Sequence, residues 1–204
     1  MKIAFLGGGN FGNNLAGLLV QAGHDVVVGL RDVARSRSAI YRVMSLEDAA
    51  AYGDVVIIAI PYQACAEVLP LLAVYLAGKI VVDATNPLKD DWSPLPLGQA
   101  TSAAEILGQL LPASTIVKAF NTIFADVITR QRIQRGNGHP VTAFIASDDI
   151  AARQTVAQIA SSVGFAPRIT GGLNNARYLE SMAHLNIQIA VVQGGGTNAA
   201  FVYG

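Results

Sequence analysis

Charged residues are scarce in this sequence. Lys and Arg number 14 and Asp and Glu number 14 among 204 residues, so that 14% of the chain is charged and the net charge is zero. Nucleic acids and anionic membranes attract basic surfaces, and we therefore expect neither as a partner. The partner is expected to be a small molecule. Because 52% of the residues are hydrophobic, we also expect part of the surface to be covered in a homodimer.

The sequence also has no long hydrophobic run. An apolar stretch such as VVIIAI, residues 55–60, is far shorter than the roughly 18 residues that a membrane-spanning helix needs. The start runs directly into a strand-like stretch, with neither a charged leader nor a cleavage site. The single cysteine, Cys65, cannot form an internal disulfide and is interpreted as a packing residue. We therefore predict a cytoplasmic protein that does not span a membrane.

Residues typical of a metal centre or of nucleophilic catalysis are few. The three histidines, His24, His139 and His184, are scattered, and the lone cysteine does not join them at a metal-ligand spacing. No Ser-His-Asp arrangement can be recognised in the sequence. We predict no metal ion and no catalytic side chain, and interpret each histidine as structural.

What the sequence does contain is a regular alternation of two patterns. Short β-branched runs, bounded by Gly, Asp or Pro, are separated by longer stretches rich in Ala and Leu. Strands are expected at 2–7, 24–30, 54–60, 79–84, 115–119, 140–146 and 166–170. Helices are expected at 11–22, 46–51, 63–76, 102–111, 121–132, 149–163 and 175–193. Continuously apolar strands that alternate with helices predict a doubly wound α/β fold: a mostly parallel sheet covered on both faces, closed by a long C-terminal helix.

Two local patterns refine this prediction. Ser147 or Asp148 is expected to cap the helix over 149–163, and Gly164 is expected to end it. The stretch LKDDWSPLPLG, residues 88–98, holds two prolines, two aspartates and a glycine and is predicted to be a loop. It follows a strand end, which is where α/β proteins bind ligands.

The most informative motif is a glycine loop. Gly7, Gly9 and Gly12 form a G-x-G-x-x-G spacing directly after the strand KIAFL and directly before a helix, as in dinucleotide-binding proteins. The first glycine would permit the tight turn, the second a close approach of a pyrophosphate, and the third close packing of helix on strand. The helix N-terminus would offer free N–H groups to the phosphates. The alternative is a purely structural turn.

Arginines follow the second strand, where an NAD-binding protein would carry an acidic residue. The stretch VVVGLRDVARSR places Arg31 at the strand tip, with Asp32 after it and Arg35 and Arg37 beyond. A guanidinium suits a 2′-phosphate through charge-assisted hydrogen bonds, so we predict NADP(H) as the cofactor. For Arg35 and Arg37, a solvated basic turn is an equally good interpretation.

Three further strand ends would border the crevice beside the nicotinamide. Ile60 and Pro61 follow the third strand, and Asn86 and Pro87 follow the fourth; both pairs could also be ordinary turns. After the fifth strand, Phe120 and Asn121 could position the carboxamide or an acceptor ring. Lys118, inside that strand, is either a buried cation with partners or a residue that reaches the sheet edge, and we favour a structural role.

Taken together, the motifs GGGNFG, VVGLRD, AIPY, VDATNP and VKAFNTI resemble those of the NADP oxidoreductases that depend on coenzyme F420, a deazaflavin. They are also similar to the cytosolic reductase domain of the six-transmembrane metalloreductases (STEAP), which carry NADPH and a flavin. The closing stretch from 176 to 204 extends the resemblance to the whole chain. The resemblance implies a single Rossmann-type domain, with a nucleotide-binding core at 1–125 and an extension at 126–204 that completes the acceptor site.

The same resemblance implies where each part of the cofactor binds. The pyrophosphate would rest on Gly9, Asn10, Phe11 and Gly12. The 2′-phosphate would lie near Leu30, Arg31 and Arg35, and the nicotinamide end near Pro61, Asn86, Phe120 and Asn121. Leu30 stands where the family often has a serine, which removes one phosphate hydrogen bond.

Hydride transfer between a nicotinamide and a flavin-like ring needs two rings held face to face and little acid–base help. The sequence therefore predicts an NADP(H)-dependent oxidoreductase whose acceptor is coenzyme F420, FMN or FAD. A non-catalytic NADP-binding module that senses redox state and a soluble flavin or ferric reductase remain alternatives. An imine reductase is disfavoured, because strand-like segments replace the all-helical region that it requires.

Overall fold

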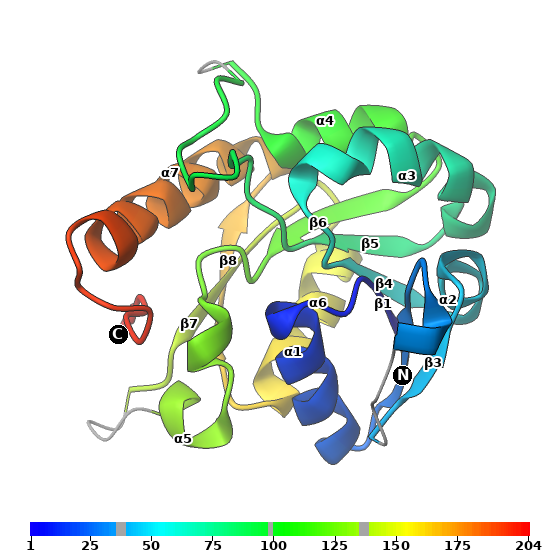
Figure 1. Cartoon of the computed structure of the whole chain (residues 1–204), viewed down its shortest axis with the longest axis horizontal. Helices are drawn as coiled ribbons and strands as arrows, with labels where there is room; N and C mark the ends of the chain where they lie inside the picture. Colours follow the sequence, from blue (N-terminus) through cyan, green and yellow to red (C-terminus); the bar gives the residue numbers. More distant parts are fainter. Residues whose placement is uncertain (36–39, 98–99, 135–138) are drawn as a thin grey trace.

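The computed structural model describes residues 1–35, 40–97, 100–134 and 139–204, and its centre is one eight-stranded sheet (Figure 1). The strand order is β3-β2-β1-β4-β5-β6-β7-β8. The pairs are parallel except β6 with β7, which is antiparallel. The strands are β1 (Lys2–Leu6), β2 (Asp25–Gly29), β3 (Arg42–Met44), β4 (Val55–Ile58), β5 (Ile80–Asp83), β6 (Thr115–Ala119), β7 (Thr142–Ala146) and β8 (Ala166–Gly171).

Helices cover both faces of the sheet. Side chains of α1 and α6 form one apolar core with one face, and those of α2, α3 and α4 form a second core with the other (Figure 1). The helices are α1 (Asn10–Gln21), α2 (Leu46–Tyr52), α3 (Tyr62–Leu76), α4 (Ala103–Leu110), α5 (Arg130–Ile133), α6 (Ile150–Ser162) and α7 (Ala176–Ile187). Short 3₁₀ turns are η1 (Val33–Arg35), η2 (Ala125–Val127) and η3 (Leu173–Asn175), and α7 continues into a π-helical turn, η4 (Gln188–Val192). The predicted doubly wound α/β fold is confirmed.

Local capping explains several helix starts. Ser45 and Ser102 accept a hydrogen bond from the backbone N–H three residues later, at the starts of α2 and α4. Asp149 caps α6 in the same way, through a 2.7 Å hydrogen bond from the N–H of Ala152. The prediction of Ser147 or Asp148 at this cap was wrong, because both side chains bond elsewhere, to the carbonyl of Ile116 and to the N–H of Leu173.

The seven predicted strands are present, each within about two residues of its expected position. The sequence did not reveal β3, a three-residue strand at the sheet edge. Strands β7 and β8 occupy the region where an imine reductase would be helical. Gly164 follows α6 with a φ of +99°, as expected for a helix stop.

The helix predicted over 121–132 was wrong. After β6 the chain runs irregularly through η2 and reaches the four-residue helix α5. Phe120, with a φ of +64°, redirects the backbone as β6 ends. The segment 121–125 therefore does not form a helix and lines a pocket at this edge of the sheet.

Candidate functional site

The glycine loop lies where the sheet changes direction of winding. Strand β1 is flanked by β2 on one side and by β4 on the other. The helix that follows β1 packs on one face of the sheet, and the helix that follows β4 packs on the other face. In doubly wound sheets such a point opens a crevice at the carboxyl ends of the strands. The loop 7–9 and the start of α1 therefore lie where a ligand of this fold would bind.

Each glycine of the motif has its own geometry. Gly7 has a φ of +111°, and a Cβ there would lie 2.5 Å from the carbonyl oxygen of Ala59. At Gly12 a Cβ would lie 2.7 Å from the carbonyl oxygen of Gly7, so helix and loop pack backbone to backbone. At Gly9 a Cβ would meet no atom within 4 Å. Gly7 and Gly12 are thus required by the fold, whereas the protein itself leaves the space at Gly9 open.

Asn13 braces this loop, a role that the sequence did not reveal. Its side-chain amide donates a 2.8 Å hydrogen bond to the carbonyl of Gly8, and its oxygen accepts one of 2.7 Å from the hydroxyl of Tyr41. Gly9 caps α1 without any side-chain hydrogen bond. The first N–H groups of α1 therefore face the crevice without a side-chain cap, an arrangement suited to an anionic ligand.

A first pocket, which we name the arginine pocket, lies on the β2 side of the glycine loop. Its volume is about 240 Å³, and it is lined by Gly7, Gly8, Gly9, Gly29, Leu30, Arg31, Leu46, Ala59, Ile60, Pro61, Ala64 and Val68. Arg31 is exposed and, within the described part of the chain, forms no ion pair. A guanidinium is therefore available to an anion at the rim of an otherwise apolar pocket.

Of the other residues predicted to bind the cofactor on the β2 and β4 side of the sheet, the structure places some in this pocket and leaves others undescribed. Ile60 and Pro61 were expected beside the nicotinamide, but they line the arginine pocket. The Pro61 carbonyl accepts hydrogen bonds from the Ala64 N–H and the Cys65 thiol and is turned into α3. Arg35 ends the 3₁₀ turn η1, and its side chain lies outside the described part of the structure. Arg37 lies outside the described residues altogether.

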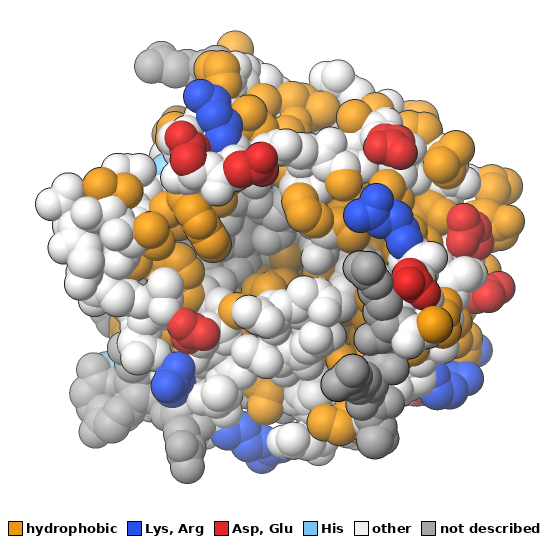
Figure 2. All heavy atoms as spheres, viewed as in Figure 1, with side chains coloured by type: hydrophobic (Ala, Val, Ile, Leu, Met, Phe, Trp, Pro, Cys, Tyr) orange, Lys and Arg blue, Asp and Glu red, His pale blue; other side chains and the backbone are white. Residues whose placement is uncertain are grey.

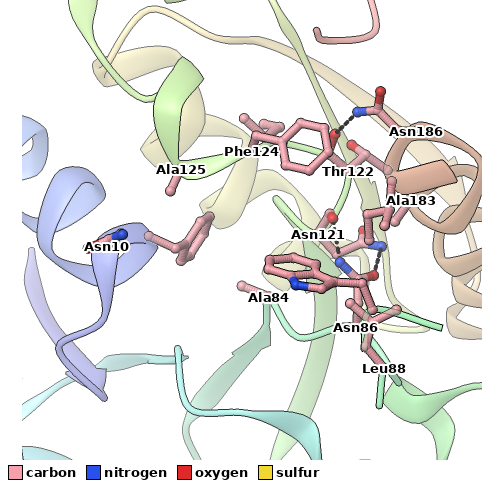
Figure 3. A pocket seen from close by; sticks show the side chains of 14 residues that line it. Asn10, Ala84, Asn86, Leu88, Asn121, Thr122, Phe124, Ala125, Ala183 and Asn186 are labelled. Atoms are coloured by element: carbon pink, nitrogen blue, oxygen red, sulfur yellow. Dashed lines mark hydrogen bonds between the residues drawn. The ribbon is translucent and has the colours of Figure 1, made fainter. Parts of the chain in front are cut away.

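A second pocket, which we name the amide pocket, lies on the other side of the loop and is visible as a hollow in Figure 2. It has a volume of about 310 Å³ and is lined by residues of α1, the ends of β5 and β6, and α7. They are Asn10, Phe11, Ala84, Asn86, Leu88, Trp92, Asn121, Thr122, Ile123, Phe124, Ala125, Ala183, Asn186 and Ile187. Segments far apart in the sequence thus meet around one cavity (Figure 3).

Two asparagines that line the amide pocket are hydrogen-bonded to each other (Figure 3). Asn86 donates a 2.7 Å hydrogen bond to the backbone carbonyl of Asn121, and Asn121 Nδ2 donates to Asn86 Oδ1 at 3.0 Å and to the carbonyl of Leu179 at 3.0 Å. These bonds fix the orientation of both amides. The closing helix α7, through Leu179, therefore helps to position Asn121.

Polar atoms in the amide pocket remain unsatisfied. Asn121 Oδ1 and Thr122 Oγ1 are buried and have no hydrogen-bond partner among the described residues. Both residues line the pocket and are at least nine-tenths buried. A buried polar atom without a partner costs about 1–3 kcal/mol. Both atoms can accept a hydrogen bond, so the pocket fits a ligand that carries an N–H or O–H donor, such as a carboxamide.

Phe120 and Pro87 do not lie where they were expected. The Phe120 side chain is buried in the core, with its ring centroid 5.9 Å from that of Phe165. It cannot pack beside a nicotinamide; the apolar core is a better environment for it, and its positive φ turns the backbone so that Asn121 faces the pocket. Pro87 lines a different cavity, together with His184.

A buried charge cluster lies on β5 and β6, the two strands that precede Asn86 and Asn121. Lys118 is 0% exposed, and its ammonium donates to Asp83 at 2.8 Å and to the carbonyl of Thr85 at 2.7 Å, and lies 2.9 Å from Glu180. Burial alone would lower the pKa of Lys118, but the two carboxylates outweigh burial and raise it. Of the two alternatives that the sequence left open, Lys118 is thus the buried cation with partners.

Glu180, on α7, connects this cluster to a fourth element, α4. Its carboxylate accepts hydrogen bonds from the backbone N–H groups of Ala103 and Ala104, at 2.9 and 3.3 Å, at the start of α4. The cluster therefore ties α7 and α4 to β5 and β6. Because Leu179 precedes Glu180, the same contacts hold the carbonyl that orients Asn121.

The remaining titratable candidates line neither of the two pockets. His24 hydrogen-bonds Ser162, and burial lowers the pKa of both His24 and His184. Burial also raises the pKa of the Cys65 thiol to about 12, which keeps it protonated. Among the described residues, no cluster of His, Cys, Asp or Glu could hold a metal ion, and no helix has the length and hydropathy to cross a bilayer.

The comparisons with known proteins agree with this geometry. Residues 2–87 match the model of a family described as "NADP oxidoreductase coenzyme F420-dependent". The chain is 36% identical to Metalloreductase STEAP3 of Rattus norvegicus over 184 residues, which are 89% of this chain and 36% of that protein. It is 28% identical to the F420-dependent NADP reductase of Methanothermobacter thermautotrophicus over 219 residues, covering 94% of this chain and 90% of that one.

A crystal structure of a protein from an Arthrobacter species, assigned as an F420-dependent NADP reductase, superimposes with a TM-score of 0.87. It is 28% identical, and the match covers 100% of this chain and 99% of that one. The chain spans only 36% of the length of each of the first curated relatives, the metalloreductases. These matches confirm the resemblance that the sequence motifs predicted.

Proposed function

We propose that this chain, a relative of the F420-dependent NADP reductases, is an NADP(H)-dependent oxidoreductase that transfers hydride between NADPH and a deazaflavin or flavin. The observation that carries the proposal is the position of the glycine loop between two pockets of different character. One has a guanidinium at its rim, and the other has buried acceptors without partners. NADP has a matching asymmetry, with the 2′-phosphate at its adenosine end, the carboxamide at its nicotinamide end and the pyrophosphate between them.

The proposed binding mode follows the two pockets. The adenosine half would occupy the arginine pocket, with the 2′-phosphate at Arg31 and the pyrophosphate over Gly9 and the start of α1. The nicotinamide would enter the amide pocket, where the carboxamide N–H groups would meet Asn121 Oδ1. Residues 126–204 would complete the acceptor site through α7, which contributes Asn186 to the same pocket.

When bound, NADPH supplies a hydride, two electrons with one hydrogen nucleus, and the oxidised acceptor takes up one proton from water to become fully reduced. The chain's own task is to hold two rings in contact and to exclude water. The amide pocket suits this task, since its wall contains amide, hydroxyl and apolar side chains and no charged one. The lack of a catalytic acid or base among its lining residues is therefore consistent with the proposal.

The test is anaerobic stopped-flow absorbance with the purified chain and NADPH, with coenzyme F420, FMN or FAD as the acceptor. We expect oxidation of NADPH by at least one acceptor, matched mole for mole by reduction of that acceptor. Tight NADPH binding without turnover on any acceptor would instead favour a redox-sensing module. Turnover only when a ferric chelate is added together with a flavin would favour a flavin-dependent ferric reductase.

Exchange of Arg31 for aspartate is expected to weaken NADPH binding about 10- to 100-fold and to change NADH binding by less than about twofold. The reason is that only NADPH carries the 2′-phosphate, which would then face a carboxylate. Dissociation constants from calorimetry measure both effects. Arg168→Asp, an exposed position on β8 remote from β2, makes the same charge change and should leave both constants unaltered.

Equal losses for NADPH and NADH in Arg31→Asp would show that this residue does not read the phosphate. The NADPH effect should also shrink as salt is added, because an exposed ion pair is screened at high ionic strength. A homodimer and a cytoplasmic location remain predictions. The dimer prediction is in keeping with exposed apolar side chains on the C-terminal helix, such as Leu185 and Ile189, which are 58% and 50% exposed.

A further inference from the structure

Trp92 is a large aromatic residue in an unusual position. It is the one tryptophan of the chain, it lies in the loop between β5 and α4, and half of its surface is exposed to solvent. The rest of the side chain lines the amide pocket. An indole at the rim of this uncharged cavity is positioned to contact whatever enters it from solvent.

The loop holds Trp92 in a conformation that tryptophan seldom adopts. Its φ is +67°, in the left-handed region that costs a non-glycine residue free energy. The N–H of Trp92 donates to the carbonyl of Lys89 at 3.0 Å, and the N–H of Lys89 donates to the carbonyl of Ser93 at 2.8 Å. Asp91 adds two hydrogen bonds, from the N–H and hydroxyl of Ser93. The backbone of the turn is thus fixed by its neighbours.

The turn is also anchored to the body of the protein. Gln63, on α3, donates a 2.9 Å hydrogen bond to the carbonyl of Leu88, and the N–H of Leu95 donates to the carbonyl of Pro87 at 2.8 Å. A β-bridge joins Leu88 and Pro94 on either side of the turn. Trp92 therefore sits on a turn that is bonded on both sides and can act as a fixed wall.

Other apolar and aromatic side chains form part of the pocket wall. Phe11 from α1, Phe124 from the segment after β6 and Ile187 from α7 line the same cavity as Trp92. No lining residue carries a charge, which favours a neutral planar ring over a charged group. Planar π systems stack on aromatic side chains with an offset and gain free energy beyond the burial of surface.

We propose that Trp92 is a positioning residue that packs against the planar ring of the hydride acceptor. This inference rests on the proposed function, in which the nicotinamide occupies the inner part of the amide pocket beside Asn86 and Asn121. The acceptor ring arrives from solvent and covers the nicotinamide, so it meets the half-exposed indole at the rim. Trp92 fixes the distance and tilt between the two rings and contributes no proton or electron.

The test uses lumiflavin, the isoalloxazine ring without a phosphate or sugar tail, added to the whole chain saturated with NADP⁺. An indole in contact with a flavin quenches the emission of the flavin, which is excited in the visible where the protein does not absorb. We expect bound lumiflavin to be strongly quenched in the wild-type protein. The lining residues of the amide pocket include no tyrosine, so loss of Trp92 is expected to restore the emission of the bound flavin.

Three variants separate an acceptor contact from a structural role. Trp92→Gly removes the ring and also suits a φ of +67°, so the thermal unfolding midpoint is expected not to fall. Its affinity for lumiflavin and its apparent affinity for the acceptor in turnover are expected to fall about 2- to 10-fold, with NADP⁺ affinity unchanged. Trp92→Ala should weaken lumiflavin by a similar factor, and Trp92→Phe should largely restore it.

The outcomes distinguish this inference from the proposed function. If the wild-type protein binds lumiflavin and Trp92→Gly binds it equally well, the role of Trp92 is overturned and the function stands. Equal weakening of NADP⁺ and lumiflavin would also overturn it, because the indole would then support the cofactor or the loop. A wild-type protein that binds no flavin and no deazaflavin overturns the proposed function and this inference together.

Discussion

Exchange of Lys118 for methionine is expected to lower the free energy of unfolding by about 3–5 kcal/mol. Methionine fills much of the same volume but leaves the carboxylates of Asp83 and Glu180 buried side by side without their cation. For a chain of this length the loss corresponds to a fall of roughly 10 °C or more in the unfolding midpoint. Thermal and urea unfolding, followed by circular dichroism, measure it.

A surface ion pair provides the matched control. Arg42 lies 3.1 Å from Asp25, with both side chains more than half exposed, so Arg42→Met should change the unfolding midpoint little. A second variant, in which Lys118→Met is combined with Asp83→Asn, should recover part of the loss because one uncompensated charge is removed. If Lys118→Met proves as stable as Arg42→Met, the buried cluster is not what holds α7 against the sheet.

The same cluster gives a defined dependence on pH. Since the pKa of Lys118 is raised in the folded protein, its contribution to stability is complete below the ordinary lysine pKa and is lost as pH rises through the raised value. Titration of this ammonium should therefore not change the stability difference between wild type and Lys118→Met near neutral pH. The difference should decline only in strong alkali, where the ammonium loses its proton.

The sequence predicted the sheet well because buried parallel strands carry a local signal. Continuous runs such as VVII in β4 remain apolar on both faces, and a glycine or aspartate bounds many of them. The strand β3 escaped notice because three residues are too few to show a pattern. The segment after β6 was mistaken for a helix because the alternating pattern predicts a helix between two strands, although Thr, Asn and β-branched residues in it favour helix formation little.

Prediction of the site succeeded where residues follow strand ends and stopped where the fold brings distant segments together. Asn86 and Asn121 could be identified because both come directly after apolar strands, and their pairing follows from β5 lying beside β6. The partners of Lys118 could not, since Asp83 becomes its neighbour only through the register of β5 on β6 and Glu180 only through the docking of α7. No sequence spacing relates Asn186 to the amide pocket.

The role of Trp92 could be predicted from the sequence only in part. The loop that carries it could be predicted from its prolines and aspartates, and its place after a strand end indicated a ligand. That the indole turns back over the amide pocket depends on a left-handed backbone conformation, which no local sequence pattern of tryptophan predicts.

Exchange of Gly9 for valine is expected to weaken NADPH and NADH about 100-fold while leaving the fold intact. A Cβ at this position meets no protein atom within 4 Å, and a φ of −71° suits any residue, so folding tolerates the side chain. The valine would instead fill the space above the first turn of α1 and separate the pyrophosphate from the N–H groups there. Losing two charge-assisted hydrogen bonds accounts for a factor of this size. Calorimetric titration with both dinucleotides provides the measurement.

The same helix offers a control that differs in place alone. Gly17, on α1, likewise has nothing within 4 Å of a Cβ, so Gly17→Val adds an equal side chain two turns further from the crevice. It should bind NADPH as the wild type does, and both variants should unfold within a few degrees of it. Since Arg31→Asp acts on NADPH alone and Gly9→Val on both dinucleotides, the pair of results separates the adenosine phosphate from the pyrophosphate. Undiminished NADPH affinity in Gly9→Val would mean that the dinucleotide does not cross the glycine loop.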